Sequence, residues 1–251
     1  MRYAKKEKFF SRIILKNEVK KMFKKLIIIA LIVVFLYVMI KSWFIIKNIP
    51  SALIFFRNNK KNDEIFPFYG MHFYVGRQGS GKTYSMTHEL EQIRKKYPKC
   101  KIYTNYGYKY QNFPIYNISM LTDEKYYNGC DGVVFAIDEI QNLYQASNVN
   151  NVTPDVLGVI TQLRKQKVYI VCSSQVFTRV SKPLREQAFY ITECKTLFHS
   201  LTVCKKYNAD EYLLDLDRVE KQATPIERYS IVHNDELRNC YDTYMLIKSI
   251  K

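Results

Sequence analysis

The segment from Met71 to about Lys96 contains the sequence feature that most limits how this chain can fold. Residues 71–75 are a short apolar run, followed by the loop Gly76-Arg77-Gln78-Gly79-Ser80-Gly81-Lys82-Thr83 and a helix-compatible segment. The spacing G-x-x-x-x-G-K-[ST] is typical of a phosphate-binding loop when it joins a strand to a helix. It therefore predicts an α/β fold, with this loop at the carboxyl end of a strand.

The residue types in the loop suit phosphate chemistry. Glycines let backbone N–H groups converge on phosphate oxygens, and a helix beginning near Gly81 adds the positive end of its dipole. We expect Lys82 to reach the β- and γ-phosphates of a nucleotide and the Thr83 hydroxyl to bind Mg²⁺. The predicted nucleotide-binding residues are Gly76, Arg77, Gln78, Gly79, Ser80, Gly81, Lys82, Thr83 and Tyr84.

A second motif supplies two carboxylates. Residues 133–137 are five apolar residues typical of a buried parallel strand, and Asp138 and Glu139 follow directly. Both should reach the sheet edge where open α/β folds bind ligands. We expect Asp138 to hold Mg²⁺ through water and Glu139 to position or polarise the attacking water, since phosphoryl transfer needs both functions.

A third strand is predicted over 168–172, and three polar residues follow it. Gln175 is the candidate γ-phosphate sensor and Ser174 the second choice, while polar residues that merely end the strand are the alternative. ATP is favoured over GTP because no N-K-x-D guanine motif occurs; residues 59–62 come closest and lack the Asp. The expected cofactors are therefore ATP and Mg²⁺.

Three segments together resemble a known family: GRQGSGKT, VVFAIDE and TQLRKQKVYIVCSSQVFTRVSKPLREQ, the last at residues 161–187. They are similar to the zonula occludens toxin-like family, the assembly ATPases of filamentous phages and related viral packaging ATPases of the FtsK–HerA type. The resemblance covers residues 70 to about 195. It implies a P-loop NTPase of the additional-strand, catalytic-Glu type with parallel sheet order 5-1-4-3-2, and a membrane-bound ATPase that drives virion DNA extrusion or packaging.

The resemblance also implies roles for single residues. It assigns the phosphate loop, the acidic strand end and the sensor to Lys82, Thr83, Asp138, Glu139 and Gln175. Arg179 and Arg185 lie where a ring ATPase, here expected to be a hexamer, could place an arginine against its neighbour's γ-phosphate. This chain departs from the filamentous-phage pattern, in which the membrane segment commonly follows the ATPase domain.

Most of the formal charge of +16 belongs to the N-terminal part. Residues 1–25 carry ten Lys/Arg and two Glu, residues 26–61 carry five Lys/Arg and no acid, and residues 62–251 carry 24 basic and 21 acidic side chains. A strong positive charge favours DNA or an anionic membrane surface as a partner. Its position here indicates that most of it reports membrane anchoring.

An apolar run of fifteen residues begins at Leu26 and continues to Ile46 with one Lys and one Ser in it. About 20 apolar residues cross a bilayer, so a membrane helix is predicted over 26–46. The basic residues before it favour a cytoplasmic N-terminus, which in a single-span protein would place the remainder outside. A second apolar run, 43–56, offers a re-entrant arm, and we expect both ends in the cytoplasm, at the cell membrane.

The predicted organisation has five parts. They are a basic segment (1–25), a membrane anchor (26–57), a linker (58–69), a P-loop ATPase core (70–195) and a C-terminal sheet extension or β-appendage (196–251). In the C-terminal part, strands are predicted over 189–192, 201–205, 211–216 and 229–233. We find no chemistry in this part from the sequence.

One segment inside the core is basic without opposing charge. No acid occurs between Asp155 and Glu186, and six Lys/Arg lie there. Arg164, Lys165 and Lys167 end a helix predicted over 154–166 and suit contacts to DNA phosphates, or alternatively cations that stabilise a helix C-terminus. Arg179 and Arg185 suit the trans-acting arginine.

Three functions fit these patterns. The favoured one is a membrane-anchored, Mg²⁺-dependent ATPase, a homo-oligomeric ring that translocates DNA with virion or membrane assembly proteins as further partners. A conjugative DNA-transfer coupling ATPase is the second. The third is a nucleotide-switched membrane interaction protein, which Glu139 and the polar residues near Gln175 disfavour because a passive binder needs no hydrolytic groups.

Overall fold

The computed structural model describes residues 21–40, 49, 50, 53, 65–116, 118–144, 152–216 and 223–242. The chain divides into two units, Met1–Asn62 and Asp63–Lys251. In the first unit a helix spans Lys21–Ile40 and is long and apolar enough to cross a membrane. Its 20 residues extend about 30 Å, the thickness of a bilayer core.

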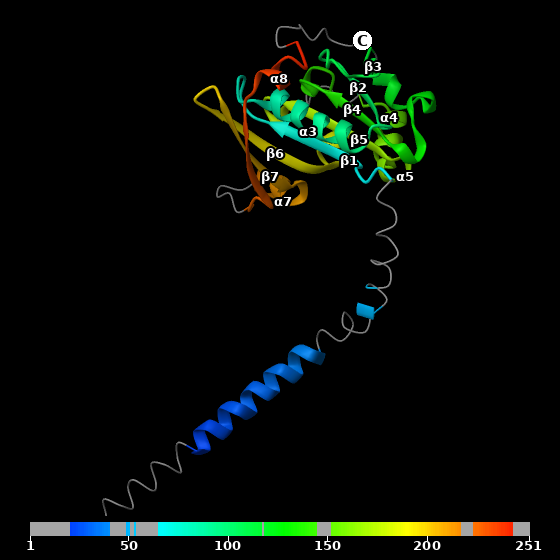
Figure 1. The fold of residues 1–251 in the computed structure, drawn as a ribbon. Coiled ribbons are helices and arrows are strands. Elements are labelled where there is room, and N and C mark those ends of the chain that lie inside the picture. The colour runs from blue at the N-terminus through cyan, green and yellow to red at the C-terminus, as the bar shows by residue number, and fades with distance from the viewer. Residues whose placement is uncertain are drawn as a thin grey trace, which may run out of the picture. The chain divides into compact units, whose positions relative to one another are not determined.

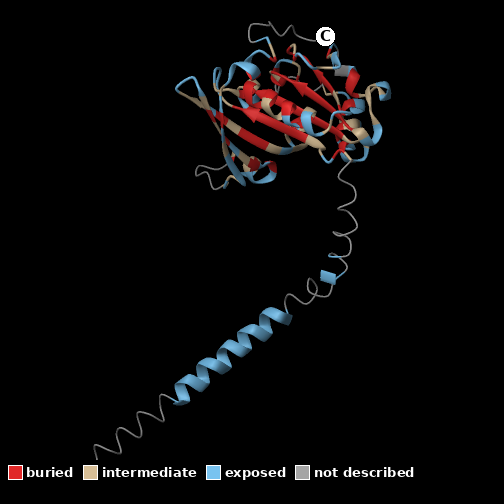
Figure 2. Ribbon diagram, in the orientation of Figure 1, coloured by how far each residue is buried: buried red, intermediate tan, exposed pale blue. Residues whose placement is uncertain are grey.

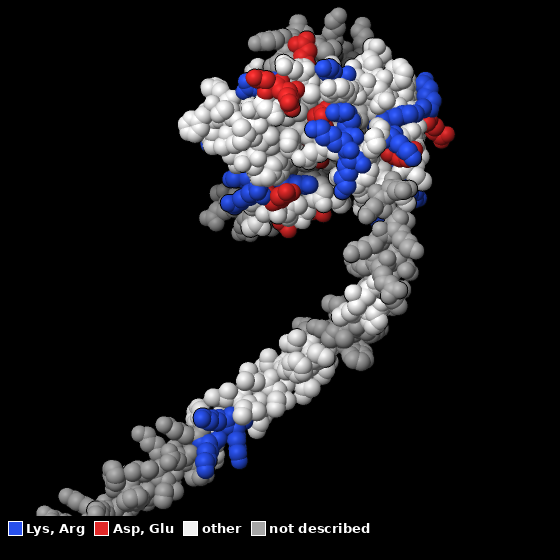
Figure 3. All heavy atoms as spheres, viewed as in Figure 1, with Lys and Arg blue, Asp and Glu red and all other residues white. Residues whose placement is uncertain are grey.

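Charged side chains on this helix are confined to its first turns (Figure 3). Residues 41–46, which end the predicted membrane span, lie outside the described residues, as does most of the predicted arm over 43–56.

The second unit is built on one eight-stranded sheet (Figure 1). Its strands are β1 Gly70–Val75, β2 Lys101–Thr104, β3 Phe113–Pro114, β4 Val133–Ile137, β5 Val168–Ser174, β6 Ala188–Leu197, β7 Leu201–Asn208 and β8 Glu227–Val232. They lie in the order β3-β2-β4-β5-β1-β6-β7-β8.

The strands from β3 to β6 are all parallel, and β7 and β8 continue the sheet antiparallel from β6. Without the two-residue β3, the parallel strands are arranged β6-β1-β5-β4-β2, which in chain order is 5-1-4-3-2. The predicted α/β fold and its strand order are therefore confirmed. The phosphate loop leaves β1 at the carboxyl edge of this sheet.

Helices cover both faces of the sheet. They are α3 Lys82–Lys96, α4 Pro154–Ile160, α5 Leu163–Gln166, α6 Lys182–Arg185, α7 Ala209–Leu216 and α8 Asp235–Arg238. Helices α3 and α8 bury apolar side chains against one face, and α4 to α7 bury theirs against the other. Every residue of β4 and β5 is buried between these layers, as Figure 2 shows for the sheet centre.

One predicted strand, 211–216, is wrong, because these residues lie in helix α7. Ala209, Tyr212, Leu213 and Leu216 are spaced i, i+3, i+4 and i+7, and all four pack against the same buried cluster. Asp210 and Glu211 lie in the first turn, where negative charge stabilises a helix. The helical period and its acidic start outweigh the apparent alternation.

The helix predicted over 154–166 forms as two shorter helices, α4 and α5. Thr153 caps α4 with its side chain, and Pro154 occupies the first turn. The break falls at Thr161 and Gln162, where the Thr161 hydroxyl donates a hydrogen bond to the Gly158 carbonyl at 2.9 Å. A hydroxyl that bonds the preceding turn competes with the backbone ladder and favours a helix end.

Candidate nucleotide site

The phosphate loop joins β1 to α3 and lies against the hairpin of β6 and β7. Gly81 caps α3 with φ 85°, a left-handed conformation that favours glycine. A Cβ on Gly81 would overlap the Thr202 hydroxyl and lie 2.7 Å from Thr196 Oγ1. A Cβ on Gly76 would lie 2.7 Å from the Cys194 carbonyl oxygen. The hairpin therefore approaches the loop so closely that both positions require glycine.

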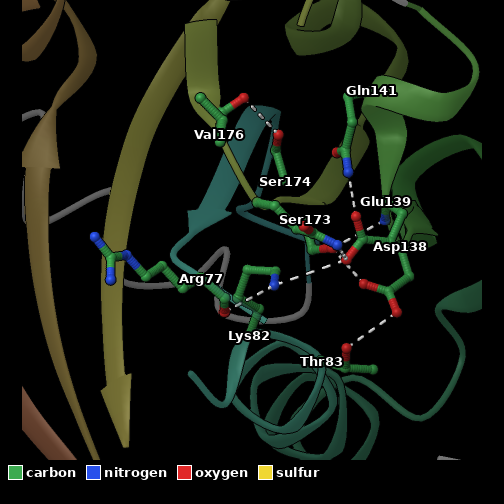
Figure 4. Close-up of polar contacts among 10 residues, drawn as sticks. Arg77, Lys82, Thr83, Asp138, Glu139, Gln141, Ser173, Ser174 and Val176 are labelled. Carbon is green, nitrogen blue, oxygen red and sulfur yellow. Dashed lines mark hydrogen bonds and ion pairs between the residues drawn. The ribbon is translucent and has the colours of Figure 1, made fainter. Parts of the chain in front are cut away.

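Lys82 begins α3 and is directed towards the carboxylates at the end of β4 (Figure 4). Its side chain is only 6% exposed. Nζ lies 3.7 Å from Glu139 Oε1 and donates to the Arg77 carbonyl oxygen at 3.4 Å. The Arg77 side chain points away from this group. The lysine and the carboxylate thus share one small volume at the carboxyl edge of the sheet.

Asp138 is buried between α3 and β5. Thr83 Oγ1 donates to Asp138 Oδ2 at 3.0 Å, and Ser173 Oγ donates to Oδ1. Burial raises the pKa of Asp138, and these two hydrogen bonds oppose the shift because they favour the carboxylate. A hydroxyl and a carboxylate side by side are oxygen ligands of the kind Mg²⁺ takes beside phosphates. Thr83 and Asp138 therefore fit a magnesium ion.

Glu139 is held in place by its own backbone and by two amides. Its φ of 53° and ψ of 49° are left-handed, which is uncommon outside glycine and often marks functional sites. Its backbone N–H donates to Ser173 Oγ at 2.9 Å. Gln175 Nε2 donates to Oε1 at 3.3 Å, and Gln141 Nε2 donates to Oε2. The carboxylate that was predicted to position water is thereby fixed in direction.

The sensor candidates lie at the end of β5, with Ser174 as its last residue and Gln175 directly after it, but only one contacts the other site residues. Gln175 bonds Glu139, whereas the Ser174 hydroxyl donates to the Val176 carbonyl at 3.0 Å. Ser174 is fully buried. The structure thus places Gln175, and not the hydroxyl of Ser174, beside the carboxylate.

Asn105 is a site residue that sequence reasoning missed. It follows β2, and its side chain makes two hydrogen bonds to the backbone of Asp138: Nδ2 donates to the carbonyl oxygen at 3.0 Å, and Oδ1 accepts from the N–H at 2.7 Å. Gln141, two residues after Glu139, was also missed. The available signal was position, because polar residues just past parallel strands gather at one sheet edge.

A cavity of about 720 Å³ opens at the loop. It is lined by Lys82, Thr83, Asp138 and Glu139, by Tyr106 shortly after β2, and by residues from the hairpin and the C-terminal part of the chain, among them Thr196, His199, His233, Arg238 and Tyr241. We take this cavity as the candidate nucleotide site because all four charged or metal-binding groups of the predicted chemistry face it.

Tyr84 lines the same cavity but directs its polar end elsewhere. Its ring stacks on His233 with centroids 4.0 Å apart, and its hydroxyl accepts from Asn234 N at 2.9 Å and donates to the Val232 carbonyl at 3.3 Å. The side chain thus connects the first turn of α3 to the segment after β8. Only the ring is left to face a nucleotide.

A second cavity, about 760 Å³, lies along another side of the loop. Gly76, Arg77, Ser80 and Gln175 contribute to its lining. Ser80 Oγ is buried and has no hydrogen-bond partner among the described residues. The predicted loop residues therefore divide between two cavities, with Gln78, Gly79 and Gly81 lining the first and Arg77 and Ser80 the second.

The five basic residues assigned to an arginine finger or to DNA lie away from the nucleotide cavity. Arg179 ends a short 3-10 helix and is exposed, and Arg185 ends α6 and is half-buried. Arg164, Lys165 and Lys167 precede β5, at the edge where the parallel strands begin, opposite the phosphate loop. Neither arginine candidate is part of the lining formed by the described residues.

Comparisons with known proteins find similar folds among solved structures. No family model matches the sequence, and no curated protein matches it. The N-terminal domain of zonular occludens toxin from Neisseria meningitidis is 15% identical, covers 69% of this chain and 98% of its own, and has a TM-score of 0.48.

The genome packaging NTPase B204 from Sulfolobus turreted icosahedral virus 2, in complex with AMPPCP, is 17% identical. The match covers 56% of this chain and 93% of that one, with a TM-score of 0.43. The DNA-packaging ATPase B204 from Sulfolobus turreted icosahedral virus is 16% identical over 63% and 98% of the two chains, with a TM-score of 0.42. At this level of similarity the function of the present chain has to be inferred from its own residues.

Proposed function

We propose that this protein is a membrane-anchored, Mg²⁺-dependent ATPase. The observation that carries the proposal is the convergence of a phosphate loop, a lysine, a hydroxyl–carboxylate pair and a fixed glutamate on one cavity. Lys82 Nζ and Thr83 Oγ1 face Glu139 and Asp138 at 3.7 Å and 3.0 Å. A protein that only binds phosphate has no need of the second carboxylate.

In the proposed reaction, water attacks the γ-phosphorus, the bond to the β–γ bridging oxygen breaks, and ADP and inorganic phosphate leave. Glu139 orients the water and accepts a hydrogen bond from it, because Gln141 and Gln175 fix the direction of its carboxylate. Lys82 neutralises charge on the phosphates. A bound Mg²⁺, held by Thr83 and Asp138, would supply further positive charge at the phosphate oxygens.

Two substitutions test the ATPase assignment in the full chain, purified in detergent. Lys82→Ala should remove ATP binding, whereas Glu139→Gln should keep ATP binding and reduce phosphate release by about 100-fold or more, as expected when the carboxylate that orients and polarises the attacking water is lost. Calorimetric titration with ATP and a phosphate-release assay measure the two effects. Unchanged hydrolysis in Glu139→Gln would refute the catalytic assignment.

We further propose that the ATPase translocates DNA during virion assembly or genome packaging. Support comes from the resemblance at residues 161–187 and from the acid-free basic stretch in the same region. Double- and single-stranded DNA should each be added to the full chain, and at least one should stimulate phosphate release. Hydrolysis that neither DNA changes would favour a nucleotide-switched interaction protein.

Ring assembly is part of this proposal, with Arg179 or Arg185 supplied to the neighbouring subunit. Their positions outside the nucleotide cavity of their own chain are compatible with a trans role. Mixing Arg179→Ala subunits with Glu139→Gln subunits should restore part of the lost activity, since some interfaces then combine an intact arginine with an intact glutamate. The same mixture with Arg185→Ala tests the second candidate, and no restoration with either would remove the trans role.

Membrane anchoring is proposed from the helix Lys21–Ile40, with the ATPase unit in the cytoplasm. A tag at the C-terminus should resist protease added to intact cells and become sensitive once the cells are opened. Digestion in intact cells would refute this topology.

A further inference from the structure

The C-terminal part of the chain, without assigned chemistry in the sequence, forms one wall of the nucleotide cavity. Strand β8 ends at Val232, and α8 follows directly, packing on α3. Leu237 of α8 is buried in the same cluster as Tyr84 and Leu90 of α3. This packing brings the last residue of α8, Arg238, to the lining of the cavity that Lys82 lines.

Arg238 is held by two acceptors. Its Nη2 donates to the His199 carbonyl oxygen at 3.0 Å and lies 3.1 Å from His233 Nδ1. A guanidinium has five N–H donors and no acceptor, so Nδ1 must accept this bond. Within the described part of the chain, the other donors of Arg238, at Nε and Nη1, form no hydrogen bond.

His233 connects this arginine to the phosphate loop. Because Nδ1 accepts, the neutral ring carries its proton on Nε2, which donates to Thr202 Oγ1 at 2.7 Å. Thr202 is the residue whose hydroxyl a Cβ on Gly81 would overlap. A continuous chain of contacts therefore runs from Arg238 through His233 and Thr202 to Gly81, the glycine that caps α3.

We propose that Arg238 is a second cation of the nucleotide site, supplied by the same chain, that binds phosphate oxygens of the nucleotide. This inference rests on the proposed ATP binding at the phosphate loop. Among the described lining residues, Lys82 and Arg238 are the only Lys or Arg, against the acids Asp138, Glu139 and Asp242. A second cation offsets the charge of a polyanion that enters this cavity, and the planar guanidinium matches phosphate geometry.

The test measures binding of two ligands to the full chain by calorimetric titration with Mg²⁺ present. One is a non-hydrolysable ATP analogue, and the other is inorganic tripolyphosphate, which has no base or ribose. Arg238→Ala should weaken both roughly 10- to 100-fold, the loss expected for a charge-assisted hydrogen bond. Arg238→Lys should lose less, because it keeps the charge.

Arg228→Ala is the matched control, since Arg228 is an exposed arginine on β8 that does not line the cavity. It should bind both ligands as the unaltered protein does. Unchanged binding in Arg238→Ala would overturn the inference. A loss for the ATP analogue alone would also overturn it, because Arg238 would then recognise base or ribose. Failure of the unaltered protein to bind the ATP analogue would instead refute the proposed function, on which this inference rests.

Discussion

The two walls of the nucleotide cavity are built in different ways. The motif wall is formed by Gln78, Gly79, Gly81, Lys82 and Thr83 with Asp138 and Glu139, and it comes from short segments that directly follow parallel strands. The C-terminal wall is formed by Thr196, His199, His233 and Arg238, and Thr202 supports it through hydrogen bonds to Thr196 and His233. It comes from the β6–β7 hairpin and the segment after β8, which are joined to each other by antiparallel pairing. Reactive groups lie in the first wall, while the second supports the loop and adds one cation.

The difference shows that the shape of the phosphate loop is not determined by the loop alone. Gly76 and Gly81 are needed because Cys194, Thr196 and Thr202 leave no space for a side chain at these positions, and not merely because glycine is flexible. The hairpin therefore restricts the shape of the phosphate loop sterically, and substitutions where the two meet should have the largest effects on ATP binding and stability.

Gly81→Ala tests that contact. The methyl group would overlap the Thr202 hydroxyl and require a left-handed alanine, and we expect ATP binding to fall more than 100-fold with a loss of unfolding free energy of about 3 kcal/mol. Gly79→Ala is the control, because its φ is also positive (76°) but nothing lies within 4 Å of the added carbon. It should cost only about 1 kcal/mol. Equal losses of thermal stability and ATP affinity in the two variants would mean that the hairpin does not restrict the shape of the loop.

Asn105→Ala should give the next largest effect, within the motif wall. It removes both hydrogen bonds that fix the Asp138 backbone, a loss of about 2 kcal/mol that corresponds to roughly 30-fold in rate. The concentration of Mg²⁺ required for half-maximal phosphate release should rise as well.

Asn128→Ala provides the comparison for Asn105. The Asn128 amide also bonds backbone carbonyls, those of Lys99 and Gly132, but at the sheet edge where the strands begin. Its substitution should lower stability without changing the Mg²⁺ requirement. If both variants shift this requirement equally, Asn105 has no specific role at the metal site.

Much of the motif wall could be predicted from the sequence because its functional residues lie in short, continuous sequence motifs. The loop, the strand ending in Asp138 and Glu139, and the strand before Gln175 each carry their own pattern, and the sheet order followed from the family resemblance. Asn105 could not be assigned in this way, since one polar residue after a short strand becomes informative only when the partner strand is known.

The C-terminal wall could not be predicted because its residues are far apart in the sequence and are brought together only by the pairing of β6, β7 and β8. Residues 211–216 were expected to be a strand, whereas they lie in helix α7, between β7 and β8 in the chain. Arg238 is the last residue of a one-turn helix and meets His199 and His233 only through the register of β7 and β8. No local pattern distinguishes it from an ordinary exposed arginine.

A triple substitution, Arg164→Ala, Lys165→Ala and Lys167→Ala, asks whether the opposite edge of the sheet has a separate function. If these cations contact DNA phosphates, DNA affinity should fall roughly tenfold. The slope of log affinity against log salt concentration should also decrease, by an amount that corresponds to the loss of up to about three phosphate contacts. ATP affinity and DNA-independent hydrolysis should be unchanged, because both walls of the cavity lie at the other edge. An unchanged salt dependence would leave these cations as stabilisers of a helix C-terminus.

The smallest expected effect is a pH dependence from His233. Burial, and next the charge of Arg238, lower the pKa of His233 below its ordinary value of 6.5, so the ring is neutral at pH 7. The contribution of His233 to nucleotide affinity is complete above pH 6.5 and decreases as the pH falls through the lowered pKa. Protonation removes the Nδ1 acceptor for Arg238 and places two cations side by side. Nucleotide affinity should therefore weaken less than tenfold between pH 7 and pH 5. His233→Gln, which cannot titrate, should lose the part of this change that His233 causes, and an identical pH profile in both proteins would show that His233 does not couple Arg238 to the loop.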